Sequence, residues 1–114
     1  MKFTREMIGD CGLTIQKVDG EDLLEIGYHL RRDQWGRGLA TEAARACRNY
    51  AFARGDASFV ISLIRPENIP SCRVAERNGM TIWKQTIHAH MTHLVYRISR
   101  MEWQALGARF AGNE

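Results

Sequence analysis

The sequence predicts an α/β protein (an α+β arrangement with a mixed sheet), in which helices cross over between the strands of one sheet. Short segments with apolar residues at every second position, typical of strands, alternate with segments whose apolar residues recur at helical spacing. The chain has 114 residues, of which 45% are hydrophobic and 25% charged, and this suits one globular domain. We therefore expect a single domain over residues 1–114, in the order strand, strand, helix, strand, helix, strand, strand.

The first two strands are expected at residues 7–17 and 23–30, joined by a hairpin turn. Asp19 and Gly20 form an Asp-Gly pair, which readily adopts the positive φ angles of a tight turn. A local irregularity is expected at residues 10–12, inside the first strand, because they include a glycine.

A helix is expected at residues 40–54, with Gly55 as its end, and a buried strand rich in Val and Ile at residues 58–64. Helical spacing places one set of side chains on the apolar face of this helix: Leu39, Ala43, Ala46, Cys47, Tyr50 and Phe52.

The second helix, expected at residues 68–77, has signals at both ends. Asn68 can cap it, Pro70 lies in its first turn, and Asn78 with Gly79 ends it. The remaining elements are strands at residues 81–88 and 93–99 and a short helix at residues 101–110.

Charge and cysteine content narrow the class of protein. The net charge of +3 permits a small anionic ligand, but the basic residues do not form the dense stripe with interleaved aromatics typical of nucleic-acid binding. The three cysteines include no C-x-x-C pair, which indicates reduced thiols. No apolar run reaches the roughly 18 residues of a membrane span, and no secretory signal is recognisable. We expect a cytoplasmic protein that binds neither nucleic acid nor membrane.

A glycine-rich turn, residues 34–39, lies between the second strand and the first helix. Gly36 and Gly38 let the backbone turn sharply and leave no Cβ between the amides and a ligand. Unpaired amides at the following helix N-terminus favour a pyrophosphate, unless the glycines serve geometry alone. A Walker A loop is excluded because no Gly-Lys pair exists, and the dinucleotide fingerprint is excluded because the following alanine comes one residue early.

Four segments follow one another in a distinctive order: Glu25 to Leu30, the turn Trp35-Gly36-Arg37-Gly38-Leu39-Ala40-Thr41, the helix start Asn68-x-x-Ser71 with Asn78-Gly79-Met80, and Val95 to Trp103. In order and spacing they resemble the GNAT superfamily of acyl-CoA N-acyltransferases, most closely its ribosomal-protein-alanine N-acetyltransferase branch. The resemblance covers most of the chain from Ile8 to Trp103 and implies a GNAT-like fold.

The resemblance implies that acetyl-CoA binds in a cleft between two parallel strands that splay apart, residues 23–30 and 58–64. The backbone near Leu30 would pair with the pantetheine arm and polarise the thioester. Asn68 would hydrogen-bond near the pantetheine, and Ser71 would donate a proton to the leaving thiolate. The implied cofactor-binding residues are Leu30, Arg31, Arg32, Trp35, Gly36, Arg37, Gly38, Leu39, Ala40, Thr41, Asn68 and Ser71.

The chain departs from the family pattern at three places. Trp35 stands at the head of the loop in place of Arg or Gln, and Ala75 stands where many members place a general-acid tyrosine. Only six residues precede Met7, where family members carry another strand and two helices. The domain is therefore either a shortened variant or lacks its N-terminal part. A shortened sheet would need a partner chain, which favours a homodimer.

Other residues suggest further chemistry. His88, His90 and His93 resemble a metal cluster, with His88 and His90 expected on one strand face. A polar hairpin tip is the simpler interpretation, because no carboxylate lies within the cluster, and we expect no metal. One of these histidines or Glu25 is the candidate base for the amine proton, although the strand position of Glu25 suits solvent equally. Cys72 is expected to pack in its helix rather than to form a covalent intermediate.

The sequence thus predicts an acetyl-CoA-dependent N-acetyltransferase. It would move an acetyl group to a primary amine, either a protein N-terminus or a small-molecule amine, by direct attack in a ternary complex. The catalytic candidates are Ser71, Asn68 and Glu25. The alternatives are a non-catalytic acyl-CoA-binding module and a structural dimer of the same fold.

Overall fold

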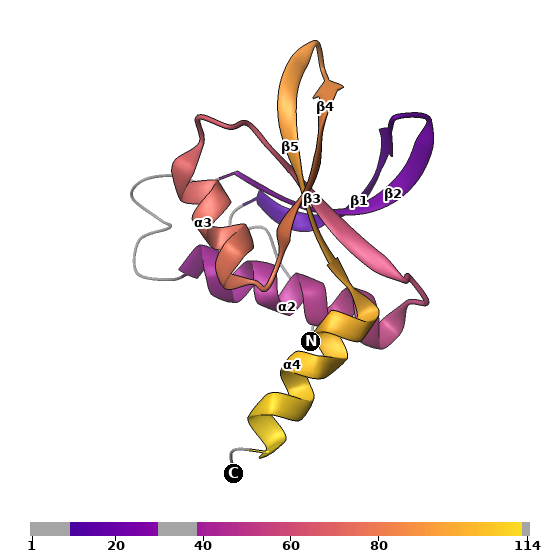
Figure 1. The fold of residues 1–114 in the computed structure, drawn as a ribbon, viewed down its shortest axis with the longest axis vertical. Helices are drawn as coiled ribbons and strands as arrows, with labels where there is room; N and C mark the ends of the chain where they lie inside the picture. The colour runs from indigo at the N-terminus through magenta and orange to yellow at the C-terminus, as the bar shows by residue number, and fades with distance from the viewer. Residues whose placement is uncertain (1–9, 30–38, 113–114) are drawn as a thin grey trace.

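The computed structural model describes the backbone of residues 10–29 and 39–112 and the side chains of residues 12–27 and 40–107. These residues form a mixed sheet with strand order β1-β2-β3-β5-β4, in which β2 and β3 are parallel and the other neighbours antiparallel. The predicted mixed α/β fold is confirmed (Figure 1). The elements are β1 (Asp10–Val18), β2 (Glu21–His29), α2 (Leu39–Arg54), β3 (Phe59–Ile64), α3 (Ile69–Arg77), β4 (Thr81–His88), β5 (Met91–Ser99) and α4 (Arg100–Gly112).

The β1–β2 hairpin has an unbroken antiparallel register along the whole of β1. Its turn residues Asp19 and Gly20 have φ angles of 50° and 87°, which confirms the predicted Asp-Gly turn. The irregularity expected at residues 10–12 is wrong, because these residues pair in order with β2. Gly12 has open space where a Cβ would lie, and a ladder made by backbone groups does not need that side chain.

Helix α2 packs closely on the sheet because small side chains make up most of its buried face. The core residues that it contributes are Ala40, Ala43, Ala44, Cys47, Ala51 and Phe52. Tyr50, expected on this face, lies at its margin and is 45% exposed. Gly55 ends the helix as predicted: its N–H donates to Ala51 O at 3.0 Å, and a Cβ at Gly55 would lie only 2.8 Å from that oxygen.

The two faces of the sheet differ in what covers them. On the first face, core residues of α2 and α3 pack against apolar side chains of β2, β3 and β5, including Ile26, Val60 and Ile98. On the second face, one residue each from β1, β3 and β5 forms a smaller buried cluster: Val18, Ile61 and Val95. Alternate residues of each strand therefore serve different cores.

The β1–β2 turn contacts β4 across the second face, and we call this contact the Asp19 brace. The Asp19 carboxylate lies 2.8 Å from Lys84 Nζ and accepts a hydrogen bond from Thr86 Oγ1 at 2.6 Å. The hydrogen bond from Lys84, with that from Thr86, lowers the pKa of Asp19. Because β2 and β4 are separated by β3 and β5 in the sheet, the sheet must curl toward its second face for this contact to form.

Helix α3 begins and ends at its predicted caps. Asn68 Oδ1 accepts a hydrogen bond from Ser71 N at 3.3 Å, and Pro70 lies in the first turn. Asn78 caps the other end, followed by Gly79 with a φ of 83°. These local signals explain why the helix boundaries were predictable within one residue.

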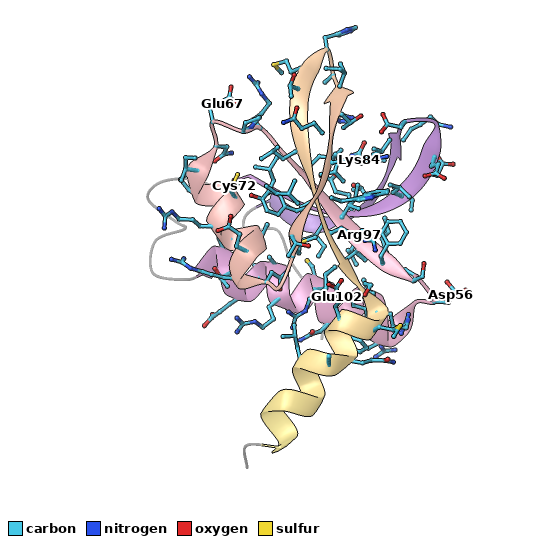
Figure 2. All side chains as sticks on the ribbon, in the orientation of Figure 1. Asp56, Glu67, Cys72, Lys84, Arg97 and Glu102 are labelled. Atoms are coloured by element: carbon cyan, nitrogen blue, oxygen red, sulfur yellow. The ribbon has the colours of Figure 1, made fainter. Side chains whose placement is uncertain are left out.

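A β-bulge interrupts the pairing of β4 with β5. The register shifts between Ile82 and Lys84, so Trp83 is an additional residue in β4. As a result Trp83 and Lys84 both lie on the second face, with the Lys84 ammonium 4.2 Å from the Trp83 ring centroid. The Trp83 ring also meets Phe59 edge-on at 5.8 Å, and the Arg97 guanidinium lies 5.2 Å from the Trp83 ring centroid. Lys84 and Arg97 are labelled in Figure 2.

Helix α4 follows β5 directly and is fixed to the end of α2 by its first turn. The Arg100 guanidinium donates hydrogen bonds of 2.8, 2.9 and 3.0 Å to the carbonyls of Phe52, Gly55 and Ala57. Trp103 stacks on Phe52 with ring centroids 5.1 Å apart. Beyond this contact α4 extends away from the sheet (Figure 1). Across residues 10–29 and 39–112, every helix is too short or too polar to cross a membrane.

Candidate functional site

The two parallel strands share only a short backbone ladder, with one register pair, Glu25 opposite Ile61. If the ladder continued, the Leu63 N–H would donate to Ile26 O. Instead the Leu63 N–H donates to Glu25 Oε2 at 3.1 Å, and Ser62 Oγ donates to Ile26 O at 2.8 Å. We call Glu25, Ile26, Ser62 and Leu63 the β2–β3 junction. The backbones of β2 and β3 therefore stop pairing in the region where the sequence predicted splayed strands.

Glu25 is a buried residue of this junction, with 8% of its surface exposed. The solvent-facing alternative for Glu25 is therefore wrong, because its strand position points into the curled second face beside Ile61. The Leu63 N–H occupies Oε2, whereas Oε1 would lie 3.6 Å from a Cβ at Gly27. Oε1 is thus the carboxylate oxygen on the Gly27 side, and as a carboxylate oxygen it can accept hydrogen bonds.

Both helices that follow the parallel strands begin at one edge of the sheet. Parallel strands end at the same edge, so the first turns of α2 and α3 both lie there (Figure 1). The first-turn amides of a helix have no intrahelical partners, and the helix dipole adds partial positive charge. Two helix N-termini beside the β2–β3 junction make this edge suited to an anionic ligand.

Among the residues that the structure describes, the buried hydroxyl Thr41 Oγ1, in the first turn of α2, has no hydrogen-bond partner. Thr41 is 7% exposed, and a buried hydroxyl left unpaired is costly. The predicted phosphate ligand would supply an acceptor here, so the described start of α2 fits the pyrophosphate of CoA. The predicted residues Leu30, Arg31, Arg32, Trp35, Gly36, Arg37 and Gly38 lie outside the described residues, as does the side chain of Leu39.

The first turn of α3 brings two predicted site residues together. Asn68 and Ser71 meet through the cap hydrogen bond, and Ser71 is buried at 4% exposure. Both residues therefore have a structural role in starting α3. This role is compatible with their predicted catalytic role, because a capping residue can also face a bound ligand.

A buried tyrosine that the sequence analysis did not single out lies against α3. Tyr96 projects from β5, and its hydroxyl donates to Glu76 Oε2 at 3.4 Å and interacts with Cys72. Burial, reinforced by Cys72 and Glu76, raises the pKa of Tyr96 above its usual range, so the phenol keeps its proton at neutral pH. Cys72, labelled on α3 in Figure 2, is buried and interacts with this tyrosine, which confirms its predicted packing role. The period-two pattern of β5 was the available signal for Tyr96.

The histidines lie at the tip of the β4–β5 hairpin. β4 ends at His88, and Ala89 and His90 form the turn with φ angles of 51° and 65°. The expectation that His88 and His90 share one strand face is therefore wrong. His93 approaches His88 across the hairpin, with ring centroids 5.3 Å apart. Within the part of the chain that the structure describes, no group of three or more His, Cys, Asp or Glu is placed to hold a metal ion.

The family of the chain follows from comparison with known proteins. The family model described as "Acetyltransferase (GNAT) domain" matches residues 2–81, which is more than half of the chain. The chain therefore belongs to the GNAT acetyltransferase family. The mixed α/β sheet agrees with this assignment, and the resemblance found in the sequence is confirmed at the level of the family.

Individual relatives define how much of a longer protein this chain matches. It is 44% identical over 79 residues to the uncharacterized protein YkkB of Bacillus subtilis (strain 168), covering 69% of this chain and 46% of YkkB. It is 37% identical over 86 residues to the uncharacterized N-acetyltransferase p20 of Bacillus licheniformis, covering 75% of this chain and 46% of p20. The structure of Mycobacterium smegmatis RimJ in complex with CoA-disulfide matches with a TM-score of 0.59 and 25% identity, covering 83% of this chain and 53% of that chain. The chain thus spans about half the length of these relatives.

Proposed function

We propose that the chain is an N-acetyltransferase domain that transfers an acetyl group from acetyl-CoA to a primary amine. The β2–β3 junction carries the proposal: in a member of the GNAT family, two parallel strands stop pairing beside two helix N-termini. The relative p20 is named an N-acetyltransferase, and the similar RimJ structure contains CoA-disulfide. Both support acetyl-CoA as the co-substrate here. The acceptor is a protein N-terminus, as in the ribosomal-protein-alanine branch, or a small-molecule amine.

We propose that three parts of the chain bind acetyl-CoA. The backbone near Leu30 pairs with the pantetheine arm, and the start of α2 holds the pyrophosphate. The buried Thr41 hydroxyl supports the second assignment. The start of α3 contributes Asn68 and Ser71. The residues proposed for the pyrophosphate are Arg31, Arg32, Trp35, Gly36, Arg37, Gly38, Leu39, Ala40 and Thr41.

Acetyl-CoA supplies an acetyl group that its thioester activates. The amine nitrogen bonds to the acetyl carbon, the carbon–sulfur bond breaks, and two protons must move. We assign the amine proton to Glu25, whose Oε1 remains available while Oε2 is held by Leu63. Ser71 donates a proton to the leaving thiolate, and Asn68 holds the cofactor beside it. Direct attack needs this positioning and proton removal, and it needs no nucleophilic side chain.

We further propose that the chain acts in the cytoplasm, without a metal, as a homodimer. The dimer is supported by the edge position of β1 in the described sheet, where Ile15 is 63% exposed. An unpaired strand edge with exposed apolar residues is suited to pairing with another chain.

Calorimetric titration with acetyl-CoA tests the proposal, with mass and oligomeric state measured on the same sample. We expect micromolar binding by the wild-type chain and acetylation of at least one amine in a panel of peptide N-termini and small amines. Gly38→Val should abolish binding without unfolding the chain, because a side chain would block the proposed amide cradle. The matched control is Gly12→Val, since a Cβ at Gly12 meets nothing within 4 Å.

The outcomes separate the alternatives. Binding without transfer to any amine would contradict the enzyme and favour an acyl-CoA-binding module. A folded chain that binds no acetyl-CoA would contradict both and leave a structural dimer of the same fold. Unchanged affinity in Gly38→Val would contradict the pyrophosphate assignment alone.

A further inference from the structure

Where the β2–β3 ladder ends, backbone groups exchange backbone partners for side-chain partners. Two backbone groups that a continued ladder would join, the Leu63 N–H and Ile26 O, are each bonded to a side chain of the opposite strand. Glu25, on β2, accepts from the β3 amide, and Ser62, on β3, donates to the β2 carbonyl. One missing backbone bond is therefore replaced by two side-chain bonds.

The two side chains approach the junction from opposite faces of the sheet. Glu25 lies opposite Ile61, which belongs to the buried cluster on the second face. Ser62 lies two positions from both Val60 and Ile64 and therefore shares their face of β3, which packs in the core beneath α2 and α3. Glu25 thus reaches the junction from the second face and Ser62 from the first face. The backbone bond between Leu63 N–H and Ile26 O can form only if these side chains are displaced.

Because the junction is buried, the arrangement in which the strands stop pairing (the open ladder) is favoured over one in which the backbone bond continues (the closed ladder). Ser62 is 1% exposed and Glu25 8% exposed, so both side chains need partners inside the protein. In the open arrangement the amide, the carbonyl, the hydroxyl and the carboxylate are all hydrogen-bonded. If the Leu63 N–H bonded to Ile26 O, the Glu25 carboxylate and the Ser62 hydroxyl would lose these partners while buried. A buried polar group without a partner is costly.

We propose that Glu25 and Ser62, which we call the exchange pair, end the β2–β3 ladder and hold the two strands apart where acetyl-CoA binds. This inference rests on the proposed function for the ligand, but not for the exchange itself. Ser62 is a positioning residue that acts through the Ile26 carbonyl. Glu25 positions β3 through Oε2, in addition to the proton transfer proposed for Oε1.

A double-mutant cycle in thermal unfolding tests the exchange without any ligand. Glu25→Leu leaves the Leu63 N–H without its acceptor, and Ser62→Ala leaves Ile26 O without its donor, so each should lower the unfolding midpoint. In the double variant the two backbone groups can bond to each other. We therefore expect its midpoint to exceed that of both single variants. Losses that simply add would overturn the proposal.

Acetyl-CoA affinity tests whether the exchange pair holds the opening. The double variant should bind acetyl-CoA at least about tenfold more weakly than the wild type although its stability is regained. A structural role alone would make affinity follow stability. Wild-type affinity in the double variant would overturn the proposal, whereas a wild-type chain that binds no acetyl-CoA would contradict the proposed function and leave the unfolding cycle valid.

Conservative variants keep the test decisive if a single variant fails to fold. Glu25→Gln retains an oxygen that accepts from the Leu63 N–H, so it should keep the unfolding midpoint and the acetyl-CoA affinity while losing turnover. Ser62→Thr retains the hydroxyl and should bind acetyl-CoA more tightly than Ser62→Ala. If Glu25→Gln destabilised the chain as much as Glu25→Leu, the hydrogen bond to Leu63 would not be what ends the ladder.

Discussion

The two edges of β3 are paired in different ways. Toward β5, six consecutive residues pair in register, from Phe59 opposite Ser99 to Ile64 opposite Leu94. Toward β2, one register pair is followed by the side-chain bonds of the junction. Val60 and Ile61 are both fully buried, so a difference in burial does not explain why the two edges pair differently. The difference lies in which groups the backbone N–H and C=O of each edge bond to.

This contrast separates what stabilises the chain from what shapes its candidate site. A continuous antiparallel ladder, with buried side chains on both faces, fixes the position of β3 in the sheet. The edge of β3 that faces β2 can then lack regular pairing while β3 keeps its place in the sheet. We expect substitutions on the β5 side to change the free energy of unfolding, and substitutions on the β2 side to change ligand binding as well.

The largest effect is expected for Ile98→Ala, in β5. Ile98 is fully buried in the main core, and shortening such a side chain costs roughly 2–5 kcal/mol of unfolding free energy. Chemical denaturation measures the loss, and the folded protein should keep its acetyl-CoA affinity. Ile82→Ala, at a position 54% exposed on β4, is the control and should change stability by at most about 0.5 kcal/mol. Weakened affinity at unchanged stability in Ile98→Ala would contradict the separation.

A smaller loss, about 2 kcal/mol, is expected for Arg100→Met. The guanidinium bonds three carbonyls at the end of α2, and this fixes the junction between β5 and α4. Methionine keeps much of the side-chain length but removes every donor. Arg73→Met, on an exposed position of α3, provides the control for loss of one positive charge. Equal denaturation midpoints for the two variants would show that the carbonyl contacts contribute nothing.

At the start of α3, Asn68 should show both kinds of effect. Asn68→Ala removes the cap of α3 and should cost about 1 kcal/mol of unfolding free energy. Asn68→Asp keeps an oxygen for the Ser71 N–H, so stability should be retained while acetyl-CoA affinity falls, because the side-chain amide donor is gone. Denaturation and calorimetry on the same samples separate these effects. If Asn68→Asp bound acetyl-CoA like the wild type, Asn68 would be a cap and no more.

The smallest effect is expected at the Asp19 brace, which is partly exposed. The lowered pKa of Asp19 means that its contribution to stability is present above the ordinary Asp value of 3.8 and is lost as the pH falls through the lowered pKa. Asp19→Asn should therefore unfold at a lower temperature than the wild type at pH 7, and the difference should vanish in strong acid. A difference that grew toward acid pH would contradict the sign.

The parts of the fold that the sequence predicted best depend on local residue chemistry. The Asp19-Gly20 turn needs positive φ angles, and the ends of α3 depend on residues one turn apart, Asn68 with Ser71 and Asn78 with Gly79. Each signal lies within the segment that it shapes. For this reason these boundaries were predicted within about two residues.

The features that escaped prediction depend on contacts distant in sequence or on turns without typical residues. Ser62 bonds a carbonyl 36 positions away, and nothing in an apolar run marks such a partner. Ala89 and His90 adopt positive φ angles without Gly or Asn, so nothing in the sequence marked a turn this tight, and β5 was expected to begin at residue 93 rather than at Met91. The glycine-rich turn predicted to hold pyrophosphate stays a prediction, because residues 30–38 lie outside those described.

The Asp19 brace has a consequence for the rate at which the chain unfolds. Asp19 and Thr86 are 67 residues apart in sequence, and they meet only when the β1–β2 turn and β4 are both in place. Contacts of such long separation close a large loop and tend to form after the folding transition state. Asp19→Asn should then speed unfolding in stopped-flow measurements and leave the folding rate unchanged. The small contribution of the brace would thus lengthen the time that each molecule stays folded without changing how quickly it folds.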